Sequence, residues 1–311
     1  MKCICLPFPV LTWILVIGMS LSAFAQHTSV GSIYFDGVYR DYILYVPESY
    51  TGEEAVPLLL NFHGYGSNAY TQMYYGDFRP IADREGFILV HPDGTKDDVG
   101  YQHWNVGGWT VGSTVDDVGF MEALIQFLMS EYTIDSSRIY ATGMSNGGYM
   151  SYLLACQLSE RIAAIASVTG SMTPETYLGC NPVHPVPVLQ IHGTADPVVP
   201  YNGNTWSLPV EDVMEFWVQE NSCSPSAVVI PLDDVDFTDG STVELITYGD
   251  CESGTAVKFY RVIGGAHTWP GTNYPSPGTN NDIDASEEIW EFFSRYDIQG
   301  KRESRRHVRP F

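Results

Sequence analysis

The sequence is short of positive charge. It has 15 Lys and Arg residues against 37 Asp and Glu residues, a formal net charge of −22. One basic residue is Lys2 and five lie in the last eleven residues, so residues 26–300 hold nine basic and 36 acidic side chains. A body this acidic repels phosphate backbones, which argues against nucleic acid as a partner. The acidic excess itself favours solubility.

Long apolar runs are missing after the first 25 residues. In that leader, Lys2 precedes an apolar stretch from Leu11 to Leu21, and Ala23-Phe24-Ala25 offers small residues before Gln26. This is the pattern of a signal peptide, and the apolar run is shorter than the roughly 20 residues of a spanning helix. We expect residues 1–25 to be removed on export, leaving a secreted, extracellular or periplasmic protein with no membrane attachment. An N-terminal membrane anchor is the alternative.

Cysteines are few, and none of them has metal-ligand spacing. Two of the six lie in the leader, and no C-x2-C pair exists after it, which argues against a zinc site. Four cysteines in an oxidising compartment suggest two disulfides, with three possible connectivities. We expect Cys156–Cys180 and Cys223–Cys251, because each pair closes a local loop. We expect no metal and no organic cofactor.

The rest of the chain has the composition of a folded domain. With 44% hydrophobic residues, it can build a sizeable core. Apolar runs of strand length alternate with stretches of helical periodicity. The predicted strands are a hairpin over 32–46, then 56–62, 87–91, 138–142, 162–168, 187–192 and 257–262. The predicted helices are 78–85, 117–132, 147–158, 210–220 and 285–296.

This alternation predicts an α/β fold. Unbroken apolar strands between helices are typical of a mostly parallel central sheet that is covered by helices on both faces. We expect one domain over residues 26–300, followed by a basic, disordered tail over 301–311. We also expect a monomer.

One motif points to nucleophilic chemistry. Gly143-Met144-Ser145-Asn146-Gly147 is a G-x-S-x-G sequence between a predicted strand and a predicted helix. That is the strand–turn–helix context of a nucleophile elbow, where flanking glycines let backbone segments approach closely and the serine takes a strained conformation. We therefore predict that Ser145 is a nucleophile. The alternative is a serine in an ordinary glycine-rich turn.

The order of residues after Ser145 suggests its partners. In hydrolases of this architecture the acid follows the serine and the histidine comes last. Asp196 lies just past the predicted strand that contains His192, and His267 lies in a glycine-rich loop after strand 257–262. Catalytic groups collect beyond the carboxyl ends of such strands, so we predict that Ser145, Asp196 and His267 project from one edge of the sheet. The alternatives are a loop-capping carboxylate and a surface histidine.

Acyl transfer also needs donors for an oxyanion. Backbone N–H groups supply them, one from the residue after the nucleophile and one from a loop after an early strand. Asn146 fills the first position. His63-Gly64-Tyr65-Gly66 follows strand 56–62, and we predict the Tyr65 N–H as the second donor. A simple strand-ending turn is the alternative.

Five motifs in order resemble a known family. They are His63-Gly64-Tyr65-Gly66, Val115-Asp116-Asp117-Val118-Gly119-Phe120, Gly143-Met144-Ser145-Asn146-Gly147-Gly148, His192-Gly193-Thr194-Ala195-Asp196 and Gly265-Ala266-His267-Thr268-Trp269-Pro270-Gly271. Together they resemble the secreted polyhydroxybutyrate depolymerase/feruloyl esterase group of α/β-hydrolases, which is related to carbohydrate esterase family one. The resemblance implies Ser145 as nucleophile, His267 as base and Asp196 as acid.

These observations predict a secreted serine carboxylesterase that works through an acyl-enzyme. We expect feruloyl or acetyl esters of plant cell-wall polysaccharide as substrates, with Trp104, Trp109 and Trp269 lining an aromatic-accepting pocket. Core packing is the alternative role for these tryptophans. Hydroxyalkanoate oligomers are the second substrate class. A peptidase of similar fold and a non-catalytic binding protein on a hydrolase fold are the remaining alternatives.

Overall fold

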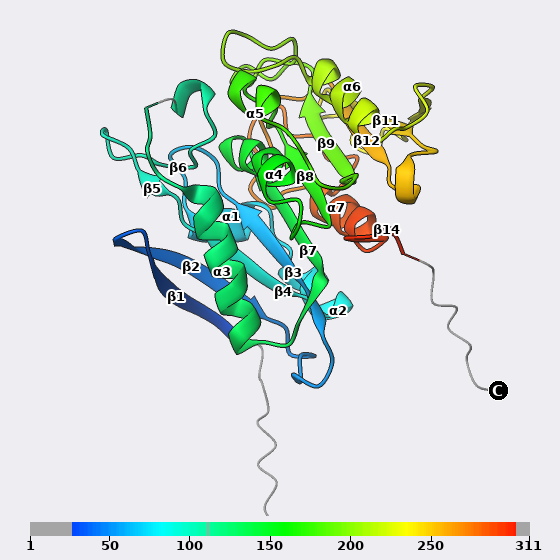
Figure 1. Ribbon diagram of the computed structural model, residues 1–311. Helices are drawn as coiled ribbons and strands as arrows, with labels where there is room; N and C mark the ends of the chain where they lie inside the picture. Colours follow the sequence, from blue (N-terminus) through cyan, green and yellow to red (C-terminus); the bar gives the residue numbers. More distant parts are fainter. Residues whose placement is uncertain (1–26, 111, 303–311) are drawn as a thin grey trace, which may run out of the picture.

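The computed structural model describes residues 27–110 and 112–302 of the chain. They form a ten-stranded sheet in the order β1-β2-β4-β3-β7-β8-β9-β12-β11-β10 (Figure 1). Its strands are β1 His27–Phe35, β2 Val38–Val46, β3 Val56–Phe62, β4 Ile88–Pro92, β7 Ile134–Met144, β8 Ala164–Val168, β9 Val188–Gly193, β10 Val228–Pro231, β11 Thr242–Tyr248 and β12 Val257–Ile263. The predicted signal peptide, residues 1–25, lies outside the described residues.

The middle of the sheet is parallel, as the sequence predicts. Strands β4, β3, β7, β8, β9 and β12 run in the same direction. Antiparallel strands β1 and β2 extend one edge, and β11 and β10 extend the other. The carboxyl ends of the six parallel strands therefore meet along one edge, where open α/β sheets hold their ligands.

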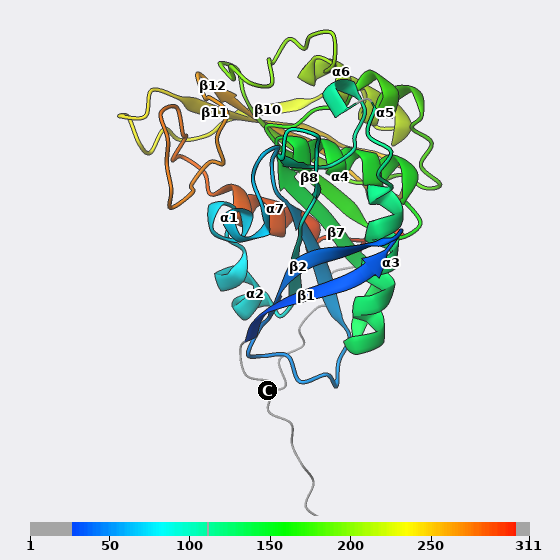
Figure 2. The same cartoon turned by 90° about the vertical axis from the view of Figure 1, so that its left-hand side faces the viewer.

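Helices cover both faces of the sheet (Figure 2). On one face lie α3 Asp117–Glu131, α4 Asn146–Gln157 and α6 Val210–Glu220, and on the other lie α2 Arg79–Glu85 and α7 Ala285–Phe293. Alternation along β3 divides its side chains between two cores: Leu58 and Leu60 face the first, and Leu59 faces the second. All three leucines are completely buried, and each such burial stabilises the fold by roughly 1.5–3 kcal/mol.

A buried ion pair joins α3 to the start of the sheet. The Arg40 guanidinium on β2 donates to the Asp117 carboxylate at 2.6 Å, and both side chains are almost fully buried. The second Asp117 oxygen accepts the N–H of Asn105 at 2.7 Å. Asp116 caps the helix by accepting the Gly119 N–H. Asp117 therefore joins the loop before α3 to β2 through these hydrogen bonds.

Several short elements were not predicted. They are α1 Ala69–Tyr75, β5 Thr95–Lys96, β6 Gln102–His103, the 3₁₀ turns η1 Gly108–Thr110 and η2 Glu252–Gly254, α5 Pro174–Leu178, the edge strand β10 with its neighbour β11, and the small hairpin of β13 Tyr296–Asp297 and β14 Gly300–Lys301. Most of them are too short to show a hydrophobic period. Among the described residues, none of the helices has both the length and the apolar surface that crossing a bilayer requires.

The predicted disordered tail begins too early. Lys301 belongs to β14 Gly300–Lys301 and pairs with Tyr296 of β13 Tyr296–Asp297. The Arg302 N–H donates to the carbonyl of Arg295 at 2.8 Å. These two residues are therefore part of the fold, and the remainder of the predicted tail lies outside the described residues.

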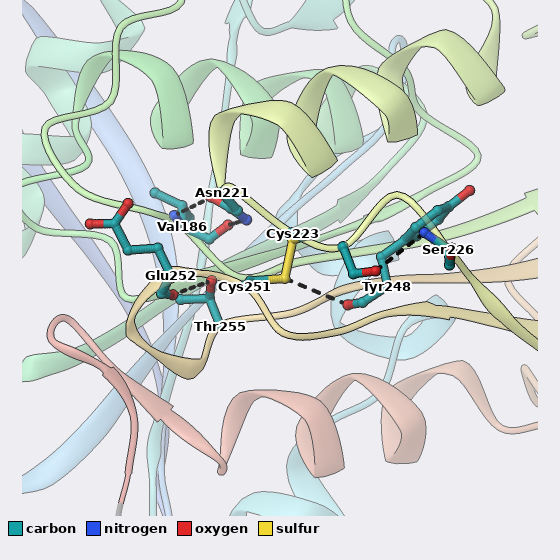
Figure 3. Close-up of a disulfide and its surroundings, with 9 residues drawn as sticks. Val186, Asn221, Cys223, Ser226, Tyr248, Cys251, Glu252 and Thr255 are labelled. Atoms are coloured by element: carbon teal, nitrogen blue, oxygen red, sulfur yellow. Dashed lines mark hydrogen bonds between the residues drawn. A yellow bond between two sulfur atoms is a disulfide. The ribbon is translucent and has the colours of Figure 1, made fainter.

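The two disulfides pair as expected, Cys156 with Cys180 and Cys223 with Cys251. The second joins the segment after α6 to the segment before β12 (Figure 3). Beside it, the Asn221 amide exchanges two hydrogen bonds with the backbone of Val186, at 3.0 and 2.7 Å. The disulfide therefore joins the end of α6 to the segment before β12, and the Asn221 hydrogen bonds join it to the segment before β9.

Candidate active site

Ser145 alone makes the turn from a strand to a helix. β7 ends at Met144 and α4 begins at Asn146, and Ser145 between them has φ 53° and ψ −119°. Residues that carry a Cβ rarely adopt a positive φ, so this backbone is strained. The Ser145 N–H donates to the carbonyl of Val168 at the end of β8, at 2.8 Å. This is the geometry of a nucleophile elbow.

The glycines around Ser145 are required by close backbone contacts. A Cβ at Gly143 would lie 2.6 Å from the carbonyl oxygen of Phe62, and one at Gly147 would lie 2.3 Å from the same oxygen. At Gly148 it would lie 2.5 Å from the Oγ of Ser167. The elbow therefore packs directly on the end of β3, which side chains at these positions would prevent.

Asp196 and His267 meet beyond the ends of β9 and β12. The Nδ1 atom of His267 lies 2.7 Å from Oδ2 of Asp196. The other oxygen, Oδ1, accepts the N–H groups of Val198 and Val199 at 2.8 and 2.9 Å. The Asp196 carboxylate is buried, while 15% of the His267 side chain is exposed. Asp196 is thus a fixed acceptor that holds the Nδ1–H of His267 and leaves its Nε2 available as a base.

The loops that carry this pair are packed against each other. The Ala195 N–H donates to the carbonyl of Gly265 at 3.0 Å. A Cβ at Gly193 would lie 2.2 Å from that same carbonyl oxygen. The glycines of both loops therefore allow the contact that brings His267 to Asp196.

A second histidine, His192, supports Asp196 from behind. Its Nε2 lies 3.0 Å from the carbonyl of Val199 and 3.5 Å from Oδ2 of Asp196, and its Nδ1 lies 3.0 Å from the Gln190 amide nitrogen. Its Nδ1 also lies 3.2 Å from the carbonyl of Gly170, so each ring nitrogen has a backbone carbonyl within reach. Complete burial lowers the pKa of His192, so the ring stays neutral. It packs beneath the acid without competing for it.

Both segments predicted to supply oxyanion donors lie next to Ser145. A Cβ at Gly64 would be 3.4 Å from the Cβ of Ser145, so the backbone that leads to Tyr65 passes beside the serine. Asn146 is the first residue of α4, where an N–H has no acceptor within the helix. Two backbone donors next to the serine are what an oxyanion hole requires.

A buried polar network fixes these two segments relative to each other. The Asn146 amide exchanges two hydrogen bonds with the backbone of Trp104, at 2.7 and 3.1 Å, and the Trp104 indole N–H donates to the carbonyl of His63 at 3.0 Å. His63 accepts the Gly94 N–H at Nε2 and lies 2.8 Å from the Gly64 carbonyl at Nδ1. Burial lowers the pKa of His63 to about 4, which keeps the neutral form that these bonds need.

The structure corrects two of the three tryptophan predictions. Trp104 is 0% exposed and Trp269 is 1% exposed, so neither ring lines an open pocket. Trp104 belongs to the network around His63. Trp269 packs edge-on against Phe78 and donates to Ser286 at 3.2 Å. Both rings therefore have the alternative role, core packing.

Trp109 is half-buried, and it has a partner that sequence reasoning missed. Its ring centroid lies 4.9 Å from those of both Tyr149 and Trp206. Tyr149 is in the first turn of α4 and bonds the Ser207 hydroxyl. Trp206 lies in the long loop that follows Asp196. Its position in that loop is the one feature of the sequence that could have placed it near the site.

The arrangement has the parts for acyl transfer: a strained serine, an oriented histidine and free backbone donors. Within residues 27–110 and 112–302, no three His, Cys, Asp or Glu side chains gather in the way that a metal ion needs. The chemistry that these side chains can supply themselves is proton transfer and nucleophilic attack.

The sheet, its crossover helices and the strand–serine–helix turn define an α/β-hydrolase. A solved acetyl xylan esterase from Aspergillus awamori has the same fold, with a TM-score of 0.59 and 15% identity over 86% of this chain and 99% of that one. The chain belongs to the Esterase PHB depolymerase family, whose model matches residues 40–202.

Two curated relatives carry esterase names. Feruloyl esterase B of Piromyces equi is 32% identical over 73% of this chain, and a bifunctional acetylxylan esterase/xylanase of Neocallimastix patriciarum is 28% identical over 85% of it. The aligned parts cover 42% and 34% of those two proteins. The chain therefore matches less than half of each of them.

Proposed function

We propose that this chain is an exported serine carboxylesterase that uses Ser145, His267 and Asp196 as its catalytic triad. One observation carries the proposal: the buried Asp196 carboxylate bonds His267 at the same sheet edge as the strained Ser145. The esterase family and the named relatives support the reaction class.

The mechanism assigns one role to each residue. His267 takes the proton of Ser145 through Nε2, and Asp196 holds the imidazole in the required tautomer and stabilises its charged form. Ser145 attacks the ester carbonyl, and the N–H groups of Tyr65 and Asn146 bind the oxyanion. The alcohol leaves with the proton from His267. Water then hydrolyses the acyl-enzyme by the same steps.

For the substrate, we propose feruloyl or acetyl esters of plant cell-wall polysaccharide. The support is that both relatives named above carry these activities in their names. Hydroxyalkanoate oligomers are the second candidate, because the family description names a PHB depolymerase.

The test compares kcat/KM on methyl ferulate and on a 3-hydroxybutyrate trimer. Ser145→Ala serves as the blank, and Ser226→Ala, at an exposed position, is the matched control. We expect Ser145→Ala to lose at least about 10³-fold in kcat with the fold intact, and the control to keep full activity. A tenfold preference for ferulate supports the cell-wall assignment, and the reverse supports the oligoester. Turnover by Ser145→Ala at the wild-type rate would overturn the triad.

A further inference from the structure

A cavity of about 440 Å³ opens beside Tyr65. One wall is the hairpin of β5 and β6, and the other is formed by residues 109–110 and 112–115. The hairpin projects from the body near the carboxyl ends of the parallel strands (Figure 1). The volume falls within the range of ligand pockets, about 300–1,000 Å³.

Each wall of the cavity is joined to the segment around Ser145. The side chain of Tyr65 forms part of the first wall, and its neighbour Gly64 lies beside Ser145. Trp109 forms part of the second wall and packs on Tyr149, one turn of α4 beyond Ser145. The cavity is therefore linked through Tyr65 and Trp109 to the two segments that flank Ser145.

The Tyr65 wall is formed in advance of any ligand. The Tyr65 hydroxyl donates to the Asp97 carboxylate, and its ring centroid lies 5.6 Å from that of Tyr101. The Gly66 N–H donates to the carbonyl of Gln102 at 2.8 Å, which fastens the hairpin to the Tyr65 loop. Tyr65 nevertheless stays 42% exposed, so a ligand can reach its ring without displacing the hairpin.

The chemistry of the lining distinguishes between the two substrate classes. The charged side chains of the lining are Lys96, Asp97 and Asp98, and the aromatic rings are Tyr65 and Trp109. The other polar side chains are His103, Thr110, Ser113 and Thr114. Ionised carboxylates only accept hydrogen bonds, so they need a ligand that donates. A sugar has many hydroxyl donors and also apolar ring faces that pack on aromatic rings. Asp97 already accepts from the Tyr65 hydroxyl and from the N–H groups of Val99 and Tyr101, so Asp98 is the carboxylate that would accept from a ligand. The repeating units of a hydroxyalkanoate oligomer offer only acceptors and would give Asp98 no hydrogen bond.

We propose that this cavity is a subsite for a sugar residue of the polysaccharide that carries the ester. The proposal rests on the proposed esterase function and narrows it to glycosyl esters. The subsite binds the alcohol part of the substrate, with Asp98 accepting sugar hydroxyls and the aromatic rings contacting a sugar face. A small ester such as methyl ferulate does not fill it.

The first test is a comparison of two ferulate esters. Asp98→Ala is expected to raise KM for a feruloylated arabinoxylan trisaccharide about tenfold, since it removes a hydrogen bond between a sugar hydroxyl and a charged group. Its kcat/KM for methyl ferulate should stay within twofold of wild type. The matched control is Asp233→Ala, an exposed aspartate outside the cavity, which should change neither. Equal effects of Asp98→Ala on both esters, or none, would overturn the subsite.

The second test does not depend on esterase activity. Calorimetry measures binding of the unesterified trisaccharide to Ser145→Ala and to the double variant Ser145→Ala/Asp98→Ala. We expect the first to bind and the second to bind about tenfold more weakly. Absence of binding to Ser145→Ala would refute the subsite, even if the enzyme hydrolyses small esters. Binding without hydrolysis of any ester by the wild-type chain would instead refute the proposed function and leave the subsite in place.

Discussion

The two halves of the candidate site are held in different ways. Around Ser145, the elbow lies so close to the end of β3 that a Cβ at Gly147 would be 2.3 Å from the carbonyl oxygen of Phe62. Around His267, the imidazole is held by one bond of 2.7 Å to Asp196 and is partly exposed. The Ser145 backbone is thus positioned by close packing against β3, whereas the His267 ring is oriented by a single carboxylate. A change at Gly147 should affect stability and activity together, and removal of the His267 side chain should affect mainly activity.

The largest expected effect is on the base. His267→Ala should reduce kcat/KM by about 10⁴-fold or more, because no other group takes the Ser145 proton. The free energy of unfolding should change much less, by about 1 kcal/mol, since the ring is partly exposed and makes one hydrogen bond. Steady-state kinetics and denaturant unfolding measure both quantities. Activity within tenfold of wild type would exclude His267 as the base, and a large loss of stability would remove the contrast between the halves.

The next effect is on the elbow. Gly147→Ala places a Cβ against the Phe62 carbonyl, and we expect a loss of about 3 kcal/mol of stability together with most of the activity. Gly249→Ala is the matched control, because a Cβ there would meet nothing within 4 Å. The control should stay within about 0.5 kcal/mol. If the two variants unfold at the same denaturant concentration, the elbow is not fixed by backbone packing.

The smallest expected effect is on the pH dependence of stability, and it comes from His91, a histidine in the core and outside the candidate site. His91 on β4 is fully buried, and burial lowers its pKa to about 3, with smaller effects from the charges of Asp77 and Arg79 and from the backbone of Asn61. Because the folded state resists protonation, the unfolded state binds the extra proton, and stability falls as the pH drops below about 6.5 towards 3.

His91→Leu should therefore gain about 2 kcal/mol relative to wild type on going from pH 8 to pH 5. The measurement is urea unfolding at both pH values, with kcat recorded in parallel. The pH profile of kcat should be the same in both proteins, since His91 is not part of the site. A stability difference that does not depend on pH would show that His91 titrates normally in the folded chain.

The sequence was sufficient for the parts of the site that are set by local backbone geometry and chain order. Gly143 and Gly147 indicated the elbow because only glycine permits such close contacts, and strand ends indicated Asp196 and His267. The tryptophans could not be predicted, because a ring in a loop gives no sign of whether it points inward, as Trp104 does, or lines a cavity, as Trp109 does.

The same limit applies to the fold. The central strands are continuous apolar runs, and their parallel arrangement followed from the intervening helices. Edge strand β10 is four residues long and exposed throughout, so it has no burial pattern to detect. The Arg40–Asp117 pair joins residues 77 positions apart, a distance over which spacing carries no information.

Reaction with a fluorophosphonate tests whether Ser145 is the nucleophile that His267 activates. The adducts are located by peptide mapping with mass spectrometry, in wild type and in His267→Ala. We expect a single adduct on Ser145 in wild type, complete loss of ester hydrolysis on labelling, and labelling at least about 10³-fold slower in His267→Ala. An adduct on another residue, or continued hydrolysis after Ser145 is fully labelled, would contradict it.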